Sequence, residues 1–186
     1  QALGRDREWY AIARDDIAPL LAEKLPLDMA VWEAWLAAPQ PTASGDWIVL
    51  ADMPGHGQAY GALTVTGDAS PYDVSGTLTT AAGDALPVSG RMNFYSGYEW
   101  RANLTIGGEE WRQVLAVSED GERLEGRQFL RGADSIGGRL TGAKAGGAPA
   151  ILGVAPAAAP AGQAVAAQVV GDGLSGLTVA ATGGAA

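Results

Sequence analysis

The chain has 186 residues and a mass of 18.9 kDa, and 47% of its residues are hydrophobic, which suffices for one full domain with additional pieces. It contains no cysteine and one histidine, which excludes disulfides, thiolate zinc sites, iron–sulfur clusters, covalent c-type haem and nearly every other metal-ligand set. The formal net charge of -9 argues against nucleic-acid binding, and no apolar run reaches the roughly 18 residues of a membrane-spanning helix.

Residues 1–40 are predicted to be helical. Apolar residues recur three or four positions apart from Trp9 to Leu21, which places them on one face of a helix. Pro26 ends this helix because proline lacks the amide donor. Asp28 is a plausible N-cap for a second short helix. The segment resembles the tail of a larger domain or a brace across a neighbouring barrel.

Residues 41–145 are predicted to form an eight-stranded antiparallel up-and-down β-barrel. Apolar and polar residues alternate in eight short runs, each ended by a turn signal such as Asp120-Gly121. Runs about 8–12 residues apart indicate a sandwich or barrel, and eight meandering strands can close and leave no free edge. The runs are Asp46–Asp52, Gln58–Gly67, Pro71–Thr79, Ala85–Tyr95, Tyr98–Ile106, Glu110–Ser118, Arg123–Arg131 and Ser135–Ala143.

The alternation also predicts which side chains fill the barrel. Large apolar residues on one face of the strands are expected inside, and glycines within the strands are expected at bulges or bends. The expected core is Trp47, Val49, Leu63, Val65, Tyr72, Val74, Leu78, Val88, Met92, Phe94, Tyr98, Trp100, Leu104, Ile106, Trp111, Leu115, Val117 and Leu124. The glycines are Gly61, Gly76, Gly90, Gly126 and Gly138.

Residues 146–186 are rich in alanine and glycine and are predicted to hold three strands: Ile151–Ala155, Ala164–Val170 and Leu177–Ala181. They are expected to open an immunoglobulin-like sandwich that is incomplete, because such a domain needs about seven strands. The segment Gly171–Gly176 matches G-x-G-x-x-G, but a strand rather than a helix is expected after it. A hairpin turn is therefore favoured over a dinucleotide site.

Five residues are candidates for an interface or pocket: His56, Tyr60, Glu99, Trp100 and Arg101. His56 lies in a glycine-flanked loop at a barrel mouth and could act as a general base, although an ordinary turn residue is favoured because no partner is adjacent in sequence. Trp100 is expected in the core, with Glu99 and Arg101 as a solvated pair on the opposite face. An interface or ligand contact is the other interpretation of this strand.

No catalytic constellation is visible in the sequence. The G-x-S-x-G elbow, the P-loop and the H-E-x-x-H helix are all absent from the chain. A catalytic, cofactor-binding or metal-binding residue is therefore not predicted.

Several stretches, in their order and spacing, resemble one family. No single stretch is a catalytic signature, and the specificity lies in the series. The stretches are Glu8–Asp15, Leu25–Asp28, Trp32–Trp35, Gly57–Gly61, Gly97–Arg101, Arg112–Gly121, Leu124–Phe129 and Ile136–Gly138. Together they resemble the middle of the alpha subunit, a dihaem cytochrome c, of quinohemoprotein amine dehydrogenase.

The resemblance implies the end of a cytochrome region, a streptavidin-like barrel and the start of an immunoglobulin-like domain. It also implies a periplasmic complex with beta and gamma subunits that oxidises primary amines to aldehydes and ammonia. In that complex a cysteine tryptophylquinone on the gamma subunit takes the electrons and passes them to haem c. This chain has no C-x-x-C-H motif, so no haem or quinone is expected in it.

Two functions of different classes are compatible with these observations, with a third as a minor possibility. The first is a non-catalytic scaffold or subunit-interface fragment of the amine dehydrogenase alpha subunit. The alternative is a stand-alone barrel that binds one small ligand inside. These two differ in how the barrel is filled, since a crowded lumen leaves no room for a ligand. The third is a self-contained enzyme that uses His56.

Overall fold

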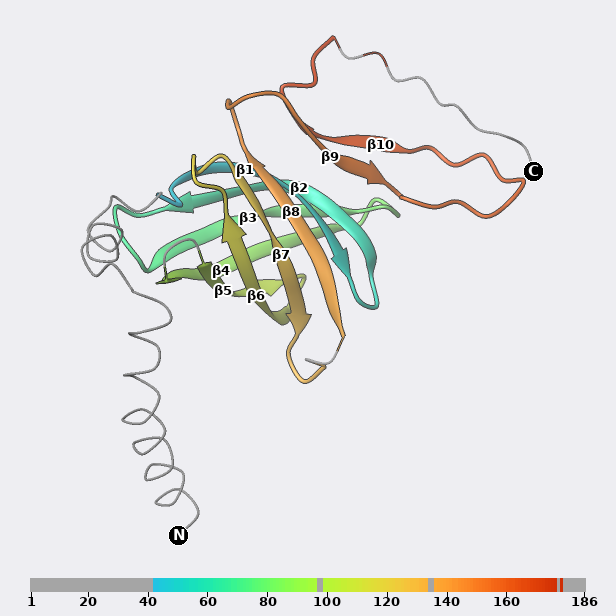
Figure 1. Cartoon of the computed structure of the whole chain (residues 1–186). Helices are drawn as coiled ribbons and strands as arrows, with labels where there is room; N and C mark the ends of the chain where they lie inside the picture. The colour runs from blue at the N-terminus through green and yellow to red at the C-terminus, as the bar shows by residue number, and fades with distance from the viewer. Residues whose placement is uncertain (1–41, 97–98, 134–135, 177, 179–186) are drawn as a thin grey trace, which may run out of the picture. The chain divides into compact units, whose positions relative to one another are not determined.

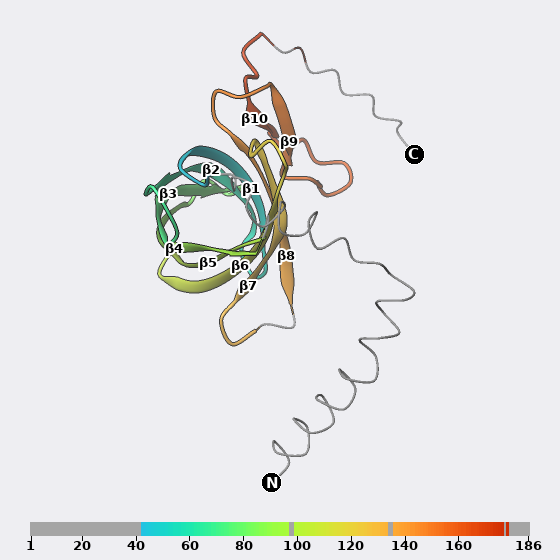
Figure 2. The ribbon, with the colours of Figure 1, turned by 60° about the vertical axis from the view of Figure 1, so that its left-hand side comes forward.

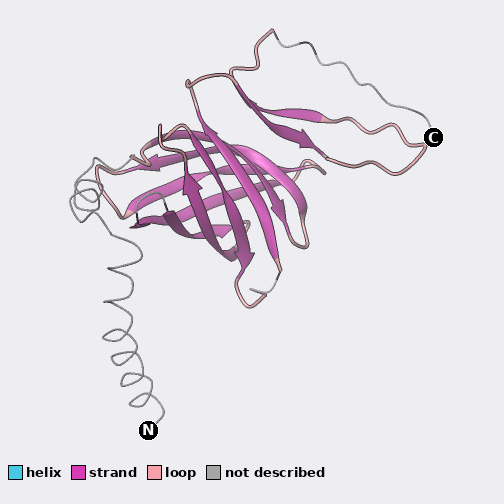
Figure 3. Cartoon of the chain, in the orientation of Figure 1, coloured by secondary structure: helices cyan, strands magenta, loops and turns pink. Residues whose placement is uncertain are grey.

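The protein is described by a computed structural model that covers residues 42–96, 99–133, 136–176 and 178. Within these residues all the regular secondary structure is β-strand (Figure 3). Eight consecutive antiparallel strands form a barrel, which closes because the eighth strand pairs with the first. Figure 1 shows the strands side by side, and Figure 2 shows the closed ring that they make. The predicted eight-stranded antiparallel barrel is confirmed.

Each observed strand overlaps one of the runs predicted from the alternation, with ends that differ by a few residues. The barrel strands are β1 (Gly45–Met53), β2 (Gly57–Thr66), β3 (Tyr72–Thr80), β4 (Ala85–Ser96), β5 (Glu99–Ile106), β6 (Glu109–Val117), β7 (Arg123–Leu130) and β8 (Gly137–Lys144). Two further strands come after the barrel, β9 (Ala150–Ala155) and β10 (Gln168–Asp172).

The predicted helices of residues 1–40 lie outside the described residues. In the part of the chain that the structure describes, there is no helix with the length and hydropathy that crossing a membrane requires.

The tight turn between β5 and β6 shows why glycine ends these strands. Gly107 and Gly108 have φ angles of 60° and 92°, a region that costs other residues steric strain. Positive φ at both central residues is the geometry of a two-residue hairpin turn whose twist matches that of its strands. The sequence therefore closes this hairpin in a register that puts one face of both strands inward.

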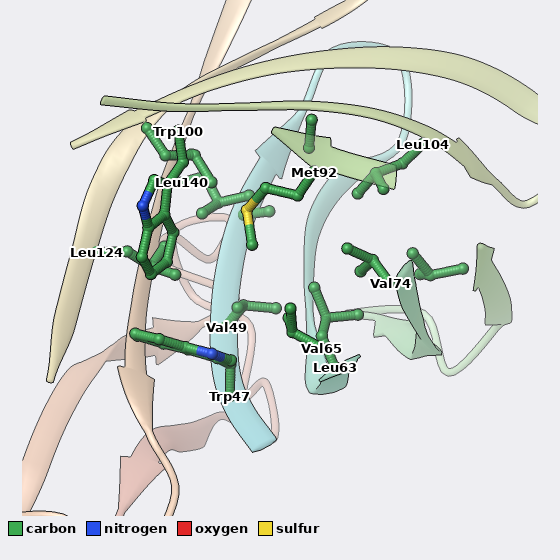
Figure 4. Packing of buried hydrophobic residues seen from close by; sticks show 14 of the residues in the cluster. Trp47, Val49, Leu63, Val65, Val74, Met92, Trp100, Leu104, Leu124 and Leu140 are labelled. Atoms are coloured by element: carbon green, nitrogen blue, oxygen red, sulfur yellow. The ribbon is translucent and has the colours of Figure 1, made fainter. Parts of the chain in front are cut away.

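The barrel interior is an apolar core built by the alternation. In β5, Trp100, Ala102, Leu104 and Ile106 are all at most 3% exposed, while the residues between them are exposed or half-buried. Figure 4 shows side chains from several strands meeting inside the barrel. Of the predicted core residues, all are buried except Phe94, which is half-buried, and Tyr98, which lies outside the described residues.

Two tryptophans anchor this core. The rings of Trp47 and Trp100 meet edge to face, with centroids 5.7 Å apart and planes at 89°. That arrangement adds about 0.5–1.5 kcal/mol beyond the burial of the rings themselves. The indole Nε1 of Trp47 donates to the Ala43 carbonyl at 2.9 Å, so this ring is also held at the end of the barrel where β1 begins.

The strand glycines lie at close approaches between neighbouring strands. A Cβ placed on Gly126 would lie 2.1 Å from the Val114 carbonyl oxygen, and one on Gly90 would lie 2.3 Å from that of Asn103. Pairing continues through both glycines without a register shift. The shift in β4 occurs between Phe94 and Ser96 instead. These glycines are therefore contact points that let the wall curve, and not bulges.

Strands β9 and β10 pair as a separate two-stranded sheet. β9 confirms the strand predicted at 151–155, whereas β10 begins four residues later than the predicted 164–170. The third predicted strand, 177–181, lies outside the described residues except for position 178. The immunoglobulin-like sandwich stays a prediction.

The β9–β10 sheet packs on the outside of the barrel. Leu50 of β1 forms a small buried cluster with Ala155 and Val170 from the two outer strands. Polar contacts reinforce it: the Ala157 amide donates to the Gln58 side chain at 2.6 Å, and the Gly146 amide donates to Asp172 at 2.9 Å. The outer surface of β1 is thus partly covered.

Candidate functional site

The five candidate residues do not form one site. His56 lies in the turn between β1 and β2, whereas Glu99 begins β5 at the opposite end of the barrel, because successive strands run antiparallel. Tyr60 lies on the outer surface of β2, and Trp100 points into the core. The candidates therefore lie in separate places: His56 is at a barrel mouth, Tyr60 is on the outer surface, and the remaining three are on β5.

His56 has a partner that the sequence did not reveal. Its Nε2 lies 2.7 Å from Oε2 of Glu109, which is 53 residues away in the chain, and its ring is 6.4 Å from that of Trp111. His56 lies just before β2 and Glu109 begins β6, and these two strands are not neighbours in the ring. The contact therefore links two separate sides of the same barrel mouth. Among the described residues, no hydroxyl hydrogen-bonds to the imidazole, so the pair lacks a nucleophile.

Tyr60 joins the barrel to the outer sheet. Its hydroxyl donates to Oε1 of Gln168 in β10 at 2.9 Å, and its ring packs against the cluster around Leu50. Position 60 faces outward beside the half-buried Ile48. Its contact is with another part of the same chain.

The β5 candidates follow the expected division between the two faces of a strand. Trp100 is 0% exposed, and Arg101 Nε donates to Glu99 Oε1 at 2.6 Å on the outer face. Both charged side chains are substantially exposed, so the pair contributes at most about 1 kcal/mol to stability. The geometry supports a core aromatic with a solvated ion pair.

A series of buried hydrogen bonds, which we call the buried polar chain, connects β6, β7 and β1, and the sequence analysis did not predict it. Gln128, which is 0% exposed, accepts from Gln113 Nε2 at 3.1 Å and donates to the Asp52 carbonyl at 3.1 Å. The carbonyl is within reach because Gly138 has no side chain: a Cβ there would lie 1.7 Å from the same oxygen. The available signal was two glutamines at inward positions of β6 and β7.

The lumen leaves no room for a small-molecule ligand. The cavity inside the barrel has a volume of about 20 Å³ and is lined mainly by core residues, with Gln113 as the polar exception. Ligand pockets typically measure about 300–1,000 Å³. Trp47, Trp100 and Trp111 fill the space, as the crowded-lumen interpretation requires. The stand-alone binding barrel is therefore disfavoured.

Within the described residues, no group of three or more histidine, aspartate or glutamate side chains is arranged to hold a metal ion. Among the groups of the described residues, one pKa is clearly shifted: hydrogen bonds from the Ser118 hydroxyl and the Glu122 amide lower the pKa of Asp120 below its usual value of 3.8. Asp120 is fully exposed and caps a hairpin. It is a structural turn residue.

Two family models match the chain. One, described as quinohemoprotein amine dehydrogenase, alpha subunit domain II, matches residues 40–145. The other, described as quinohemoprotein amine dehydrogenase A, alpha subunit, haem binding, matches residues 1–32. The first match covers more than half of the chain and coincides with the barrel. No curated protein matches the chain.

Designed barrels are among the solved structures with a similar shape. A de novo designed fluorescence-activating β-barrel is 14% identical with a TM-score of 0.45, over 54% of this chain and 92% of that one. The redesigned barrel mFAP1, bound to DFHBI, is 16% identical with a TM-score of 0.45, over 53% and 90%. We draw nothing about function from these likenesses.

The residues present do not fit a covalently attached haem. Such attachment uses the two cysteines and the histidine of a C-x-x-C-H motif. Residues 1–32, which the haem-binding model matches, contain neither cysteine nor histidine, and the whole chain has no cysteine. The single histidine, His56, is engaged with Glu109. We therefore derive no chemical step through haem in this chain.

Proposed function

Because this chain belongs to the family of quinohemoprotein amine dehydrogenase alpha subunits, we propose that it is a non-catalytic scaffold segment at a subunit interface of that enzyme. The observation that carries the proposal is the filled lumen, with its cavity of about 20 Å³. A barrel that cannot hold a ligand inside acts through its outer surface and its rigidity.

The complex in which this segment would serve oxidatively deaminates primary amines and passes the electrons to haem c. As the resemblance implies, its quinone would be a cysteine tryptophylquinone on a gamma subunit, and this chain has no cysteine of its own. A beta subunit would complete the complex, and the proposed location is the bacterial periplasm. None of these groups is assigned to a residue of this chain.

The proposed mechanism is positional. All eight strands are paired on both sides, so the wall has no free edge that could move independently. A wall of this kind holds the surfaces on its outside at fixed separations. Holding reacting groups in place is a real contribution to rate, because it removes the entropic cost of bringing them together.

The proposal is tested on the purified full chain and on the assembled complex. The chain alone is expected to show no haem absorption band and no amine-dependent reduction of a dye, and an affinity-tagged chain is expected to recover the beta and gamma subunits. A tagged Trp100→Ala variant, which should lose the barrel fold, serves as the control and should recover neither subunit. Amine oxidation by the chain alone, or failure of the wild-type chain to recover a partner subunit, would refute the scaffold role.

A further inference from the structure

Arginines are concentrated on one side of the barrel, and the exception is Arg91 on β4, which forms an ion pair with Asp73 of β3. Residues 42–90 contain five aspartates and no lysine or arginine. The outward side of β5–β8, together with the turn after β7, carries many arginines, and we call it the arginine face. Its arginines are Arg101, Arg112, Arg123, Arg127, Arg131 and Arg139. This separation occurs in a chain whose net charge is -9.

Glutamates on the same strands offset only part of this charge. Three of them form ion pairs on the arginine face, and all three pairs are exposed enough to exchange partners at little cost. The pairs are Glu99 with Arg101, Glu110 with Arg131, and Glu125 with Arg139, the last at 3.5 Å.

Two arginines stand directly opposite each other on β7 and β8. Arg127 of β7 is the cross-strand partner of Arg139 of β8, and both are exposed. Side chains so paired have Cβ atoms about 5 Å apart, and like charges in that position destabilise a sheet. Within the described residues no carboxylate forms an ion pair with Arg127. An external anion between these two guanidinium groups would attract both of them and offset their mutual repulsion.

The neighbouring positions are typical of a protein interface. The guanidinium of Arg112 lies 4.8 Å from the ring centre of Phe129, which is its cross-strand partner and only half-buried. Stacking on an aromatic ring limits the rotamers that Arg112 would lose on binding. Arginine and aromatic side chains are enriched at interfaces, whereas lysine is depleted.

A hollow borders the same patch. It has a volume of about 410 Å³ and is lined by residues of β5, β6 and the turn after β7, among them Asn103, Thr105, Arg112 and the ion-paired Glu110 and Arg131. Amide, hydroxyl and guanidinium donors thus line a concave surface, together with the carboxylate of Glu110. A protruding acidic side chain would find several donors there at once.

We infer that the arginine face docks an acidic surface of a partner protein, with carboxylates lying between Arg127 and Arg139 and in the adjoining hollow. This inference deepens the proposed function and rests on it for the complex in which the docking occurs. The occupant is a protein with a few well-placed carboxylates and not a nucleic acid, because the net charge of -9 on the chain repels a long polyanion.

The first test uses a short polyglutamate peptide as the probe and the full chain as the target. Amide resonances are followed during titration, at an ionic strength of about 0.02 M and again at about 0.3 M. Shifts are expected on β6–β8 around Arg112, Arg127, Phe129 and Arg139, and they should weaken at high salt. Absence of shifts, or shifts centred on another surface, would overturn the inference. Equal binding of a single-stranded oligonucleotide would overturn the choice of occupant.

Matched variants separate a specific face from overall charge. The double variant Arg127→Gln/Arg139→Gln and the control Thr77→Glu/Ser89→Glu change the net charge by the same amount, and all four positions are exposed. Arg127→Gln/Arg139→Gln should weaken peptide binding about tenfold, because two favourable charge contacts are lost. The control should weaken it less than about twofold. Equal weakening in both would show that only overall charge matters.

Recovery of partner subunits distinguishes this inference from the proposed function. If tagged Arg127→Gln/Arg139→Gln recovers fewer partner subunits than the control does, both stand. If it recovers as much as wild type while wild type recovers the subunits, the docking face is wrong and the scaffold role stands. If the peptide binds as expected but wild type recovers no subunit, the arginine face is an acidic-protein site and the amine dehydrogenase setting is wrong.

Discussion

Replacing Gln128 by leucine is expected to destabilise the barrel by about 2–4 kcal/mol. The substitution removes both of its buried hydrogen bonds, to Gln113 Nε2 and to the Asp52 carbonyl. Each buried polar group left without a partner costs about 1–3 kcal/mol, and the added apolar surface of leucine offsets part of that sum. The expected loss is large for a domain whose total stability is about 5–15 kcal/mol.

A double-mutant cycle makes the reasoning sharper. Gln113→Leu alone should cost about 1–2 kcal/mol, because it leaves the Gln128 carbonyl oxygen without a donor. In Gln113→Leu/Gln128→Leu both partners are apolar, and only the Asp52 carbonyl loses a donor, so the double variant should cost less than Gln128→Leu alone. The two substitutions should therefore show a coupling of about 2 kcal/mol.

The assay is unfolding in urea, with the midpoint and the slope fitted for each variant. Gln168→Leu is the matched control, because it also removes a glutamine hydrogen bond, to Tyr60, at an exposed position where water can substitute. It should cost about 0.5 kcal/mol or less. Additive effects in the cycle, or a Gln128→Leu variant as stable as wild type, would show that the buried polar chain does not stabilise the barrel.

Three further predictions concern glycine, tryptophan and pH. Gly138→Ala should destabilise the barrel by more than about 3 kcal/mol in urea unfolding, because its Cβ would overlap the Asp52 carbonyl. The control Gly83→Ala should cost only about 1 kcal/mol, because position 83 has open space around it and only its φ of 95° is unfavourable for alanine. Trp111→Phe should change stability by less than about 1.5 kcal/mol, since the buried indole Nε1 has no hydrogen-bond partner, while Trp111→Ala should cost about 3–5 kcal/mol; equal losses would contradict this account. The carboxyl of Asp120 should titrate below 3.8 by NMR, so its contribution to stability is present above the unfolded pKa and is lost as the pH falls through the lower folded value, and Asp120→Asn should remove that dependence.

The fold was largely predictable because a barrel strand carries its structure locally. The alternation along β5 places Trp100, Leu104 and Ile106 inside, and the glycine turn at 107–108 sets the pairing of β5 with β6. Closure of β8 onto β1 was inferred from the number of strands, and it is confirmed. Pattern could not determine how the strand glycines act, because that depends on the neighbouring strand.

The candidate site was predicted less well, because its contacts join distant parts of the chain. Trp100 and the Glu99–Arg101 pair followed from alternation within one strand. The partner of His56 is 53 residues away, and that of Tyr60, Gln168, is 108 residues away in the outer sheet.

By itself the sequence determined an eight-stranded wall, its apolar side and the family to which the series of stretches pointed, because side-chain period and turn chemistry are local properties. Only the tertiary structure decided that the lumen is full, that Gln128 reaches the Asp52 carbonyl past Gly138, and that Arg127 faces Arg139. Those facts depend on strand register and on curvature around the closed ring, which bring together residues that no local pattern relates.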